Sequence, residues 1–141
     1  MRAFVTILLC CSSITSYGQQ RLKWSTFERL EFIEVYNEDQ AAWLQQPVWS
    51  ESLLNWDGAN VKITGYVIAL DVVSKEYALS AFPFASCFFC GAAGPESVLE
   101  LNFTHPQEFL TDDVVTFRGI LKLNTIPLSF PLTLIDAESI E

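Results

Sequence analysis

Five short segments rich in β-branched and aromatic residues follow one another in the second half of the chain, separated by turn residues. Their sequences are VKITGYVIAL, EYALSAF, SVLELNF, VVTFRGILKL and LSFPLTLID. Their length and their period of two predict strands. Gly65 and Gly119 lie inside two of them, where a glycine indicates a bulge or a sharply coiled strand. Pro131 suits an edge or a bulge in the last segment.

Short strands of this number, two of them coiled, are typical of a small barrel. We predict a mainly β chain in which residues 61–136 form an OB-like five-stranded barrel. A sandwich-like β domain is the alternative.

The segment before the strands, residues 19–60, has mixed character and contains all four tryptophans of the chain. WSTFERLEFIEVY fits either a strand or a short helix. DQAAWLQQ predicts a helical turn ended by Pro47, and SESLLNWDG predicts a short helix with Ser50 as its N-cap. We therefore expect a Trp-rich, partly helical extension. Its tryptophans are expected to pack against the sheet, with the lining of a ligand groove as the alternative.

Residues 1–18 have the features of a secretory signal peptide: Arg2, a short apolar run and then small polar residues. We expect cleavage after Gly18 and export to the periplasm or the medium. A lipoprotein signal is a poorer fit because Leu9 precedes Cys10. Nothing after the signal is long and apolar enough to predict a transmembrane helix.

The chain is strongly acidic, with 8 Lys and Arg against 17 Asp and Glu. Loss of Arg2 with the signal changes the net charge from −9 to −10. Because phosphate backbones are bound by cationic patches and this chain has no Lys/Arg cluster, nucleic acid is not an expected partner. Cations or a basic patch on another protein suit this charge better.

The stretch SCFFCGAAGPES connects two of the predicted strands and contains Cys87 and Cys90. Thiolates two residues apart can reach one soft or borderline metal ion such as zinc, with Glu96 and His105 as the remaining candidate ligands. In an exported protein the same pair can form a disulfide. We weigh these two readings about equally and place buried core thiols third.

Catalysis has less support than any of these. The flanking β segments do not provide the helix N-terminus that activates the cysteine of a thioredoxin-type site, so a thiol-redox protein is a weaker alternative. His105 is the single histidine, and no nucleophile elbow accompanies it. Asp112 and Asp113 are expected in an acidic turn, although they could approach a metal.

The order of a GY strand, the segment LSAFPF, a cysteine loop and SVLELNF resembles an uncharacterised family of bacterial exported or periplasmic proteins, known only as a domain of unknown function. Many members have Cys-x-His and a proline run in this loop. Here Phe89 stands in place of the histidine and Cys90 follows it, which is similar to a Bacteroidetes-type branch. The resemblance implies an accessory of zinc uptake or of an ABC-type exporter.

Taken together, the sequence predicts an exported, non-catalytic binding module. The favoured ligand is a transition metal held at Cys87 and Cys90, or a component of a metal or membrane transport system. A structural or partner-binding β domain with a disulfide-closed loop is the alternative.

Overall fold

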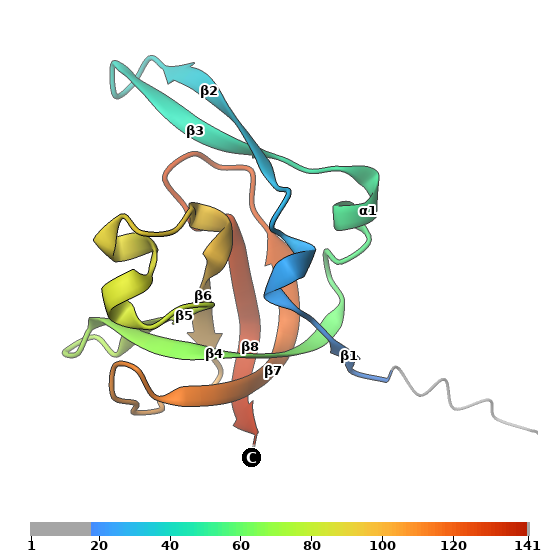
Figure 1. The fold of residues 1–141 in the computed structure, drawn as a ribbon, viewed down its shortest axis with the longest axis vertical. Helices are drawn as coiled ribbons and strands as arrows, with labels where there is room; N and C mark the ends of the chain where they lie inside the picture. Colours follow the sequence, from blue (N-terminus) through green and yellow to red (C-terminus); the bar gives the residue numbers. More distant parts are fainter. Residues whose placement is uncertain (1–17, 141) are drawn as a thin grey trace, which may run out of the picture.

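The computed structural model describes residues 18–140, and five of its strands close into a barrel (Figure 1). Around the barrel the order is β4-β5-β6-β8-β7, and β7 pairs with β4 to complete the circle. All neighbours are antiparallel except β6 and β8. The mainly β, OB-like prediction is confirmed. The strands are β4 (Asn60–Asp71), β5 (Glu76–Ser80), β6 (Val98–Phe103), β7 (Val114–Leu123) and β8 (Leu132–Ile140).

Closure depends on β4, which pairs with β7 along its first half and with β5 along its second. Gly65 lies where the strand passes from one partner to the other. A Cβ at this position would lie 2.5 Å from the backbone oxygen of Ser80, so the two strands approach too closely there for any other residue. Gly65 therefore permits the sharp coil predicted for it, and the register shift of β4 falls further on, between Ala69 and Asp71.

Gly119 has the second close approach, to the backbone oxygen of Ile135, and the register of β7 with β8 shifts beside it. Strand β8 begins directly after Pro131 and continues to Ile140. The last strand predicted from the sequence, residues 128–136, therefore begins and ends too early. The residues that follow Asp136 are mostly polar and do not have the apolar pattern of a strand. They belong to β8 because they pair with the start of β7.

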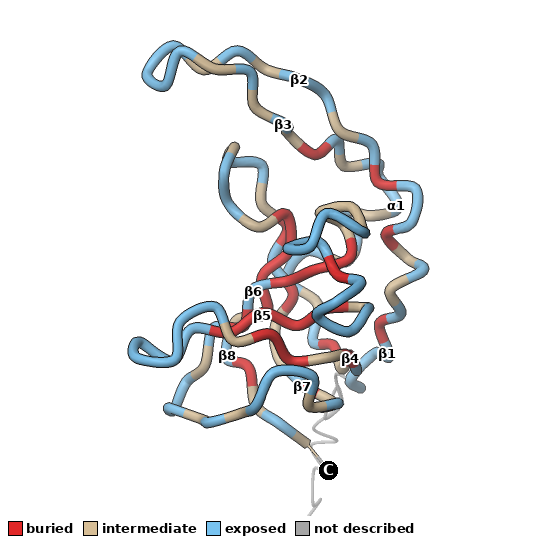
Figure 2. Tube along the Cα trace, turned by 60° about the vertical axis from the view of Figure 1, so that its left-hand side comes forward, coloured by how far each residue is buried: buried red, intermediate tan, exposed pale blue. Residues whose placement is uncertain are grey.

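The barrel interior holds the main hydrophobic core, and Figure 2 shows buried residues concentrated in these strands. Phe27 and Phe117 are its largest fully buried side chains. Phe103 and Phe109 pack on this core and on each other, with ring centroids 5.9 Å apart. The apolar side chains of the predicted strands thus meet inside the barrel.

The extension before the barrel contains less helix than predicted. Its elements are β1 (Gln20–Arg21), η1 (Trp24–Thr26), β2 (Glu31–Asn37), β3 (Ala42–Val48) and α1 (Glu51–Leu54). The short helix is confirmed, with the Ser50 hydroxyl accepting from the Leu53 N–H. The helical turn predicted for DQAAWLQQ is wrong, because these residues form the turn and most of strand β3. Alternate side chains of this stretch point to opposite faces, and β2 supplies the pairing partner that the sequence does not reveal.

Strands β2 and β3 form a separate antiparallel hairpin that stands above the barrel (Figure 1). Tryptophans in the segments on either side of the hairpin form hydrogen bonds with the barrel and its loops. Trp24 donates to the Thr64 carbonyl at 2.9 Å, and Trp49 donates to the Asn124 carbonyl at 3.2 Å. Trp24, Trp49 and Trp56 pack on the core as predicted, whereas Trp43 on the hairpin does not.

Within residues 18–140, no helix is long and apolar enough to cross a membrane. The predicted signal peptide lies outside the described residues, apart from Gly18.

Candidate functional site

The cysteine loop, residues 81–97, connects β5 to β6 through three short 3-10 turns: η2 (Phe84–Ser86), η3 (Phe88–Cys90) and η4 (Pro95–Ser97). Gly91 ends η3 in the left-handed conformation, with φ of 72°, and its N–H bonds to the Phe88 carbonyl. A glycine adopts this backbone without strain. Neither cysteine lies at the start of an α-helix, the position that lowers thiol pKa values in thioredoxin-type sites.

The two cysteines differ in burial, but their thiols donate hydrogen bonds to the same carbonyl oxygen. Cys87 is fully buried and packs with Ile68, Ala78 and Val98, so the core reading applies to this one thiol. Cys90 is exposed. Both sulfurs donate to the carbonyl oxygen of Phe84, at 3.0 Å from Cys87 Sγ and 2.9 Å from Cys90 Sγ.

This arrangement disfavours the thiolate form of Cys90. Partial desolvation raises the pKa of the Cys90 thiol above its usual value, and the neighbouring Cys87 raises it further. A raised pKa leaves less thiolate at neutral pH, and the thiolate is both the nucleophile and the metal ligand. Metal binding or disulfide formation here therefore has to release protons.

Asp112 binds the backbone N–H of Phe84, whereas the thiols bind the carbonyl oxygen of that residue. Oδ1 of Asp112 accepts the Phe84 N–H at 2.7 Å, while the Asp112 backbone is left-handed with φ of 72°. Asp113 instead accepts the N–H of Leu110 within its own turn. The turn predicted for this pair is therefore present. No local pattern indicates that Asp112 binds the backbone of Phe84, the residue on which both thiols converge, 28 positions away.

The other two candidate ligands do not join the thiols. Glu96 is half-buried in η4, and its carboxylate folds back against Gly94. His105 is exposed in the connection after β6, whereas the cysteine loop precedes that strand. Five residue steps along β6 place the two ends of that strand about 17 Å apart, and His105 follows the end away from the thiols. Among residues 18–140, no three His, Cys, Asp or Glu side chains form a group that could hold a metal ion.

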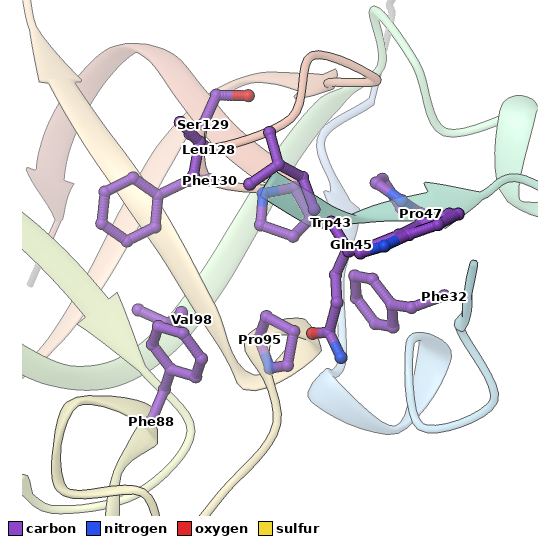
Figure 3. Close-up of a pocket in the computed structure, with 12 residues that line it drawn as sticks. Phe32, Trp43, Gln45, Pro47, Phe88, Pro95, Val98, Leu128, Ser129 and Phe130 are labelled. Atoms are coloured by element: carbon purple, nitrogen blue, oxygen red, sulfur yellow. The ribbon is translucent and has the colours of Figure 1, made fainter. Parts of the chain in front are cut away.

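An apolar groove of about 380 Å³ lies between the hairpin and the end of the barrel (Figure 3). Three segments build it: the hairpin, the cysteine loop and the connection between β7 and β8. Leu128 in that connection has a left-handed backbone with φ of 71°, which is rare for a leucine. The main lining residues are Phe32, Trp43, Pro47, Phe88, Pro95, Leu128 and Phe130.

From the sequence, a Trp-lined groove was only the alternative to packing on the sheet, and the tryptophan that lines it, Trp43, was not predicted. The alternation of side chains between the two faces of the hairpin strands is the feature that could have identified this groove lining. Phe32, Trp43 and Pro47 share one face because alternate strand residues do and because Phe32 is paired with Pro47. That face turns toward the barrel end.

Comparison with family models, with curated proteins and with solved structures finds no match to this chain. The family resemblance and the location outside the cytoplasm therefore stay predictions from the sequence.

Proposed function

We propose that this protein is a small exported binding module, in the periplasm or the medium, whose Cys87–Cys90 pair binds a soft or borderline transition-metal ion such as zinc. One observation supports this most: the two thiols converge on the Phe84 carbonyl. Deprotonated sulfurs directed to one point suit a single ion. The acidic surface favours cations as well.

With two protein ligands, this site is open rather than a closed structural one, and water or a partner supplies the remaining positions. An open site suits transfer of the ion to another protein. This is consistent with the accessory role in metal uptake or in an ABC-type transport system that the sequence resemblance implies.

The test is to purify the exported chain without oxygen and to measure bound metal and free thiols in the same sample. We expect one zinc ion per chain, lost in Cys90→Ser, whose side chain is exposed and whose replacement leaves the core intact. His105→Ala and Glu96→Gln are matched controls and are expected to retain the ion. Two free thiols with no metal at micromolar zinc would contradict the proposal.

A structural or partner-binding β domain closed by a Cys87–Cys90 disulfide is the second candidate. The same convergence favours it, since an oxidising compartment joins neighbouring thiols. In the experiment above it predicts no metal and no free thiols. A thiol-redox protein has less support because the raised pKa of Cys90 opposes nucleophilic attack.

A further inference from the structure

One face of the β2–β3 hairpin combines aromatic rings with a carboxylate. Tyr36 is paired with Trp43, and the two rings meet edge to face, with centroids 5.4 Å apart. Glu34 lies on the same strand two residues before Tyr36, and so on the same face. We call this surface the aromatic face; its residues are Phe32, Glu34, Tyr36, Trp43, Gln45 and Pro47.

The outer half of the aromatic face is open to solvent. Trp43 is 67 % exposed and Tyr36 is 49 % exposed, whereas the other tryptophans of the chain are half-buried against the core. Toward the barrel the same face continues into the groove, where Figure 3 shows Phe32, Trp43, Gln45 and Pro47 around the cavity. Large exposed aromatic surface of this kind marks interaction sites.

The charge of the hairpin defines what suits this surface. Residues 31–48 contain Glu31, Glu34, Glu38 and Asp39 and no lysine or arginine. A second copy of this chain would bring the same negative charges together, which is unfavourable. A cationic group is favoured by two interactions: charge attraction to the carboxylates, and cation–π contact with the rings of Trp43 and Tyr36.

The distance along the hairpin defines the shape of the ligand. From Tyr36 at the outer end to Phe32 at the groove is four residue steps, or about 13 Å. A single small ion cannot contact both ends. An extended segment of about four residues spans this length, with alternate side chains directed to the aromatic face.

We propose that the aromatic face and the groove bind an extended basic segment of a partner protein. A lysine or arginine of the segment lies against Trp43 and Tyr36 beside Glu34. An apolar side chain further along enters the groove between Phe32 and Leu128. Neither Cys87 nor Cys90 lines this binding site, so the proposal does not depend on whether the two thiols bind a metal or form a disulfide.

The test uses the exported chain and three fluorescein-labelled nine-residue serine peptides that carry valine at position 7 and arginine, serine or glutamate at position 3, so that both side chains lie on the same face of the extended peptide, four residues apart. Fluorescence anisotropy measures binding at low and at raised salt. We expect the arginine peptide to bind and the other two to bind at least about tenfold more weakly, with raised salt weakening the arginine peptide. Trp43→Leu, which keeps an apolar strand residue, is expected to weaken binding about tenfold, and Glu34→Gln about threefold.

Two variants at the opposite end of the barrel serve as controls. Leu110→Ala removes an exposed apolar side chain and Glu76→Gln removes an exposed carboxylate, and both are expected to bind as the native chain does. Circular dichroism verifies that each variant is folded. Equal binding of all three peptides, no binding of any of them, or unchanged affinity in folded Trp43→Leu would overturn the proposal. So would a reversible dimer in sedimentation that Trp43→Leu abolishes, because the aromatic face would then bind a second copy.

Discussion

The carbonyl oxygen of Phe84 organises the cysteine loop. This oxygen accepts hydrogen bonds from both thiols, and the N–H of the same residue donates a hydrogen bond to the Asp112 carboxylate. The position of the thiol pair therefore depends on a side chain from a different loop. A charge-assisted hydrogen bond of this kind is stronger than a neutral one, so Asp112 is a positioning residue for both cysteines.

Asp112 allows a matched pair of substitutions. Its left-handed backbone is tolerated by glycine and by asparagine, so neither replacement introduces strain. Asp112→Gly removes the acceptor, and we expect the Phe84 amide to exchange its hydrogen about tenfold faster, equivalent to ~1.4 kcal/mol. Asp112→Asn retains an oxygen acceptor without the charge and is expected to exchange at a rate between those of the native chain and of Asp112→Gly. Native-state hydrogen exchange measures both, and equal exchange rates in the two variants would disprove this role.

The thiol of Cys90 gives a prediction that depends on pH. Because its pKa is raised, the thiolate fraction is lower than that of an ordinary cysteine until the pH exceeds the raised value. We expect iodoacetamide to alkylate Cys90 more slowly than it alkylates glutathione at pH 7.5, with the ratio approaching one as the pH rises. Mass spectrometry of the peptide containing Cys90 follows the rate, and faster alkylation than glutathione at pH 7.5 would refute the raised pKa.

At the scale of elements, the barrel and the hairpin are stabilised differently. The barrel strands are paired on both sides and bury a shared core. The hairpin strands pair only with each other among the described residues, and their aromatic face covers the barrel end only in part. A two-stranded sheet of this kind is only marginally stable by itself.

Closure of the barrel is tested at Gly65. Gly65→Ala places a methyl group against the backbone oxygen of Ser80, and the strands must separate to accommodate it. We expect the free energy of unfolding to fall by about 1–3 kcal/mol. Gly94→Ala is the control, since the atoms nearest to an added methyl there belong to the flexible end of Glu96, and we expect a change within ~0.5 kcal/mol. Urea denaturation measures both; equal stability of the two variants would show that the close approach at Gly65 is unimportant.

Across the whole molecule, unequal stabilisation predicts unequal opening. Local unfolding begins where few apolar contacts are buried. We expect the amides of β2 and β3 to exchange hydrogen well before those of β4 and β7. We expect the arginine peptide to slow exchange in the hairpin and in the two loops that line the groove, but not in β4 and β7. Hydrogen exchange with mass spectrometry resolves these segments. Uniform protection of hairpin and barrel would mean that they unfold as one cooperative unit.

The sequence alone determined the mainly β barrel, its five strands and the placement of both cysteines in a connection between strands. These features follow from local rules: the alternation of apolar residues, the interior glycines and the turn residues are all visible within about ten residues. The cap at Ser50 was predictable for the same reason.

Only the tertiary structure decided which distant residues meet. It paired DQAAWLQQ with β2 as a strand, left Trp43 exposed, joined Asp112 to Phe84 and kept His105 at the other end of β6. A local pattern states which face of a strand is apolar, but not which strand or loop will cover it. That depends on how the closed barrel arranges its loops in space, so the candidate site was found in the sequence only as far as Cys87 and Cys90.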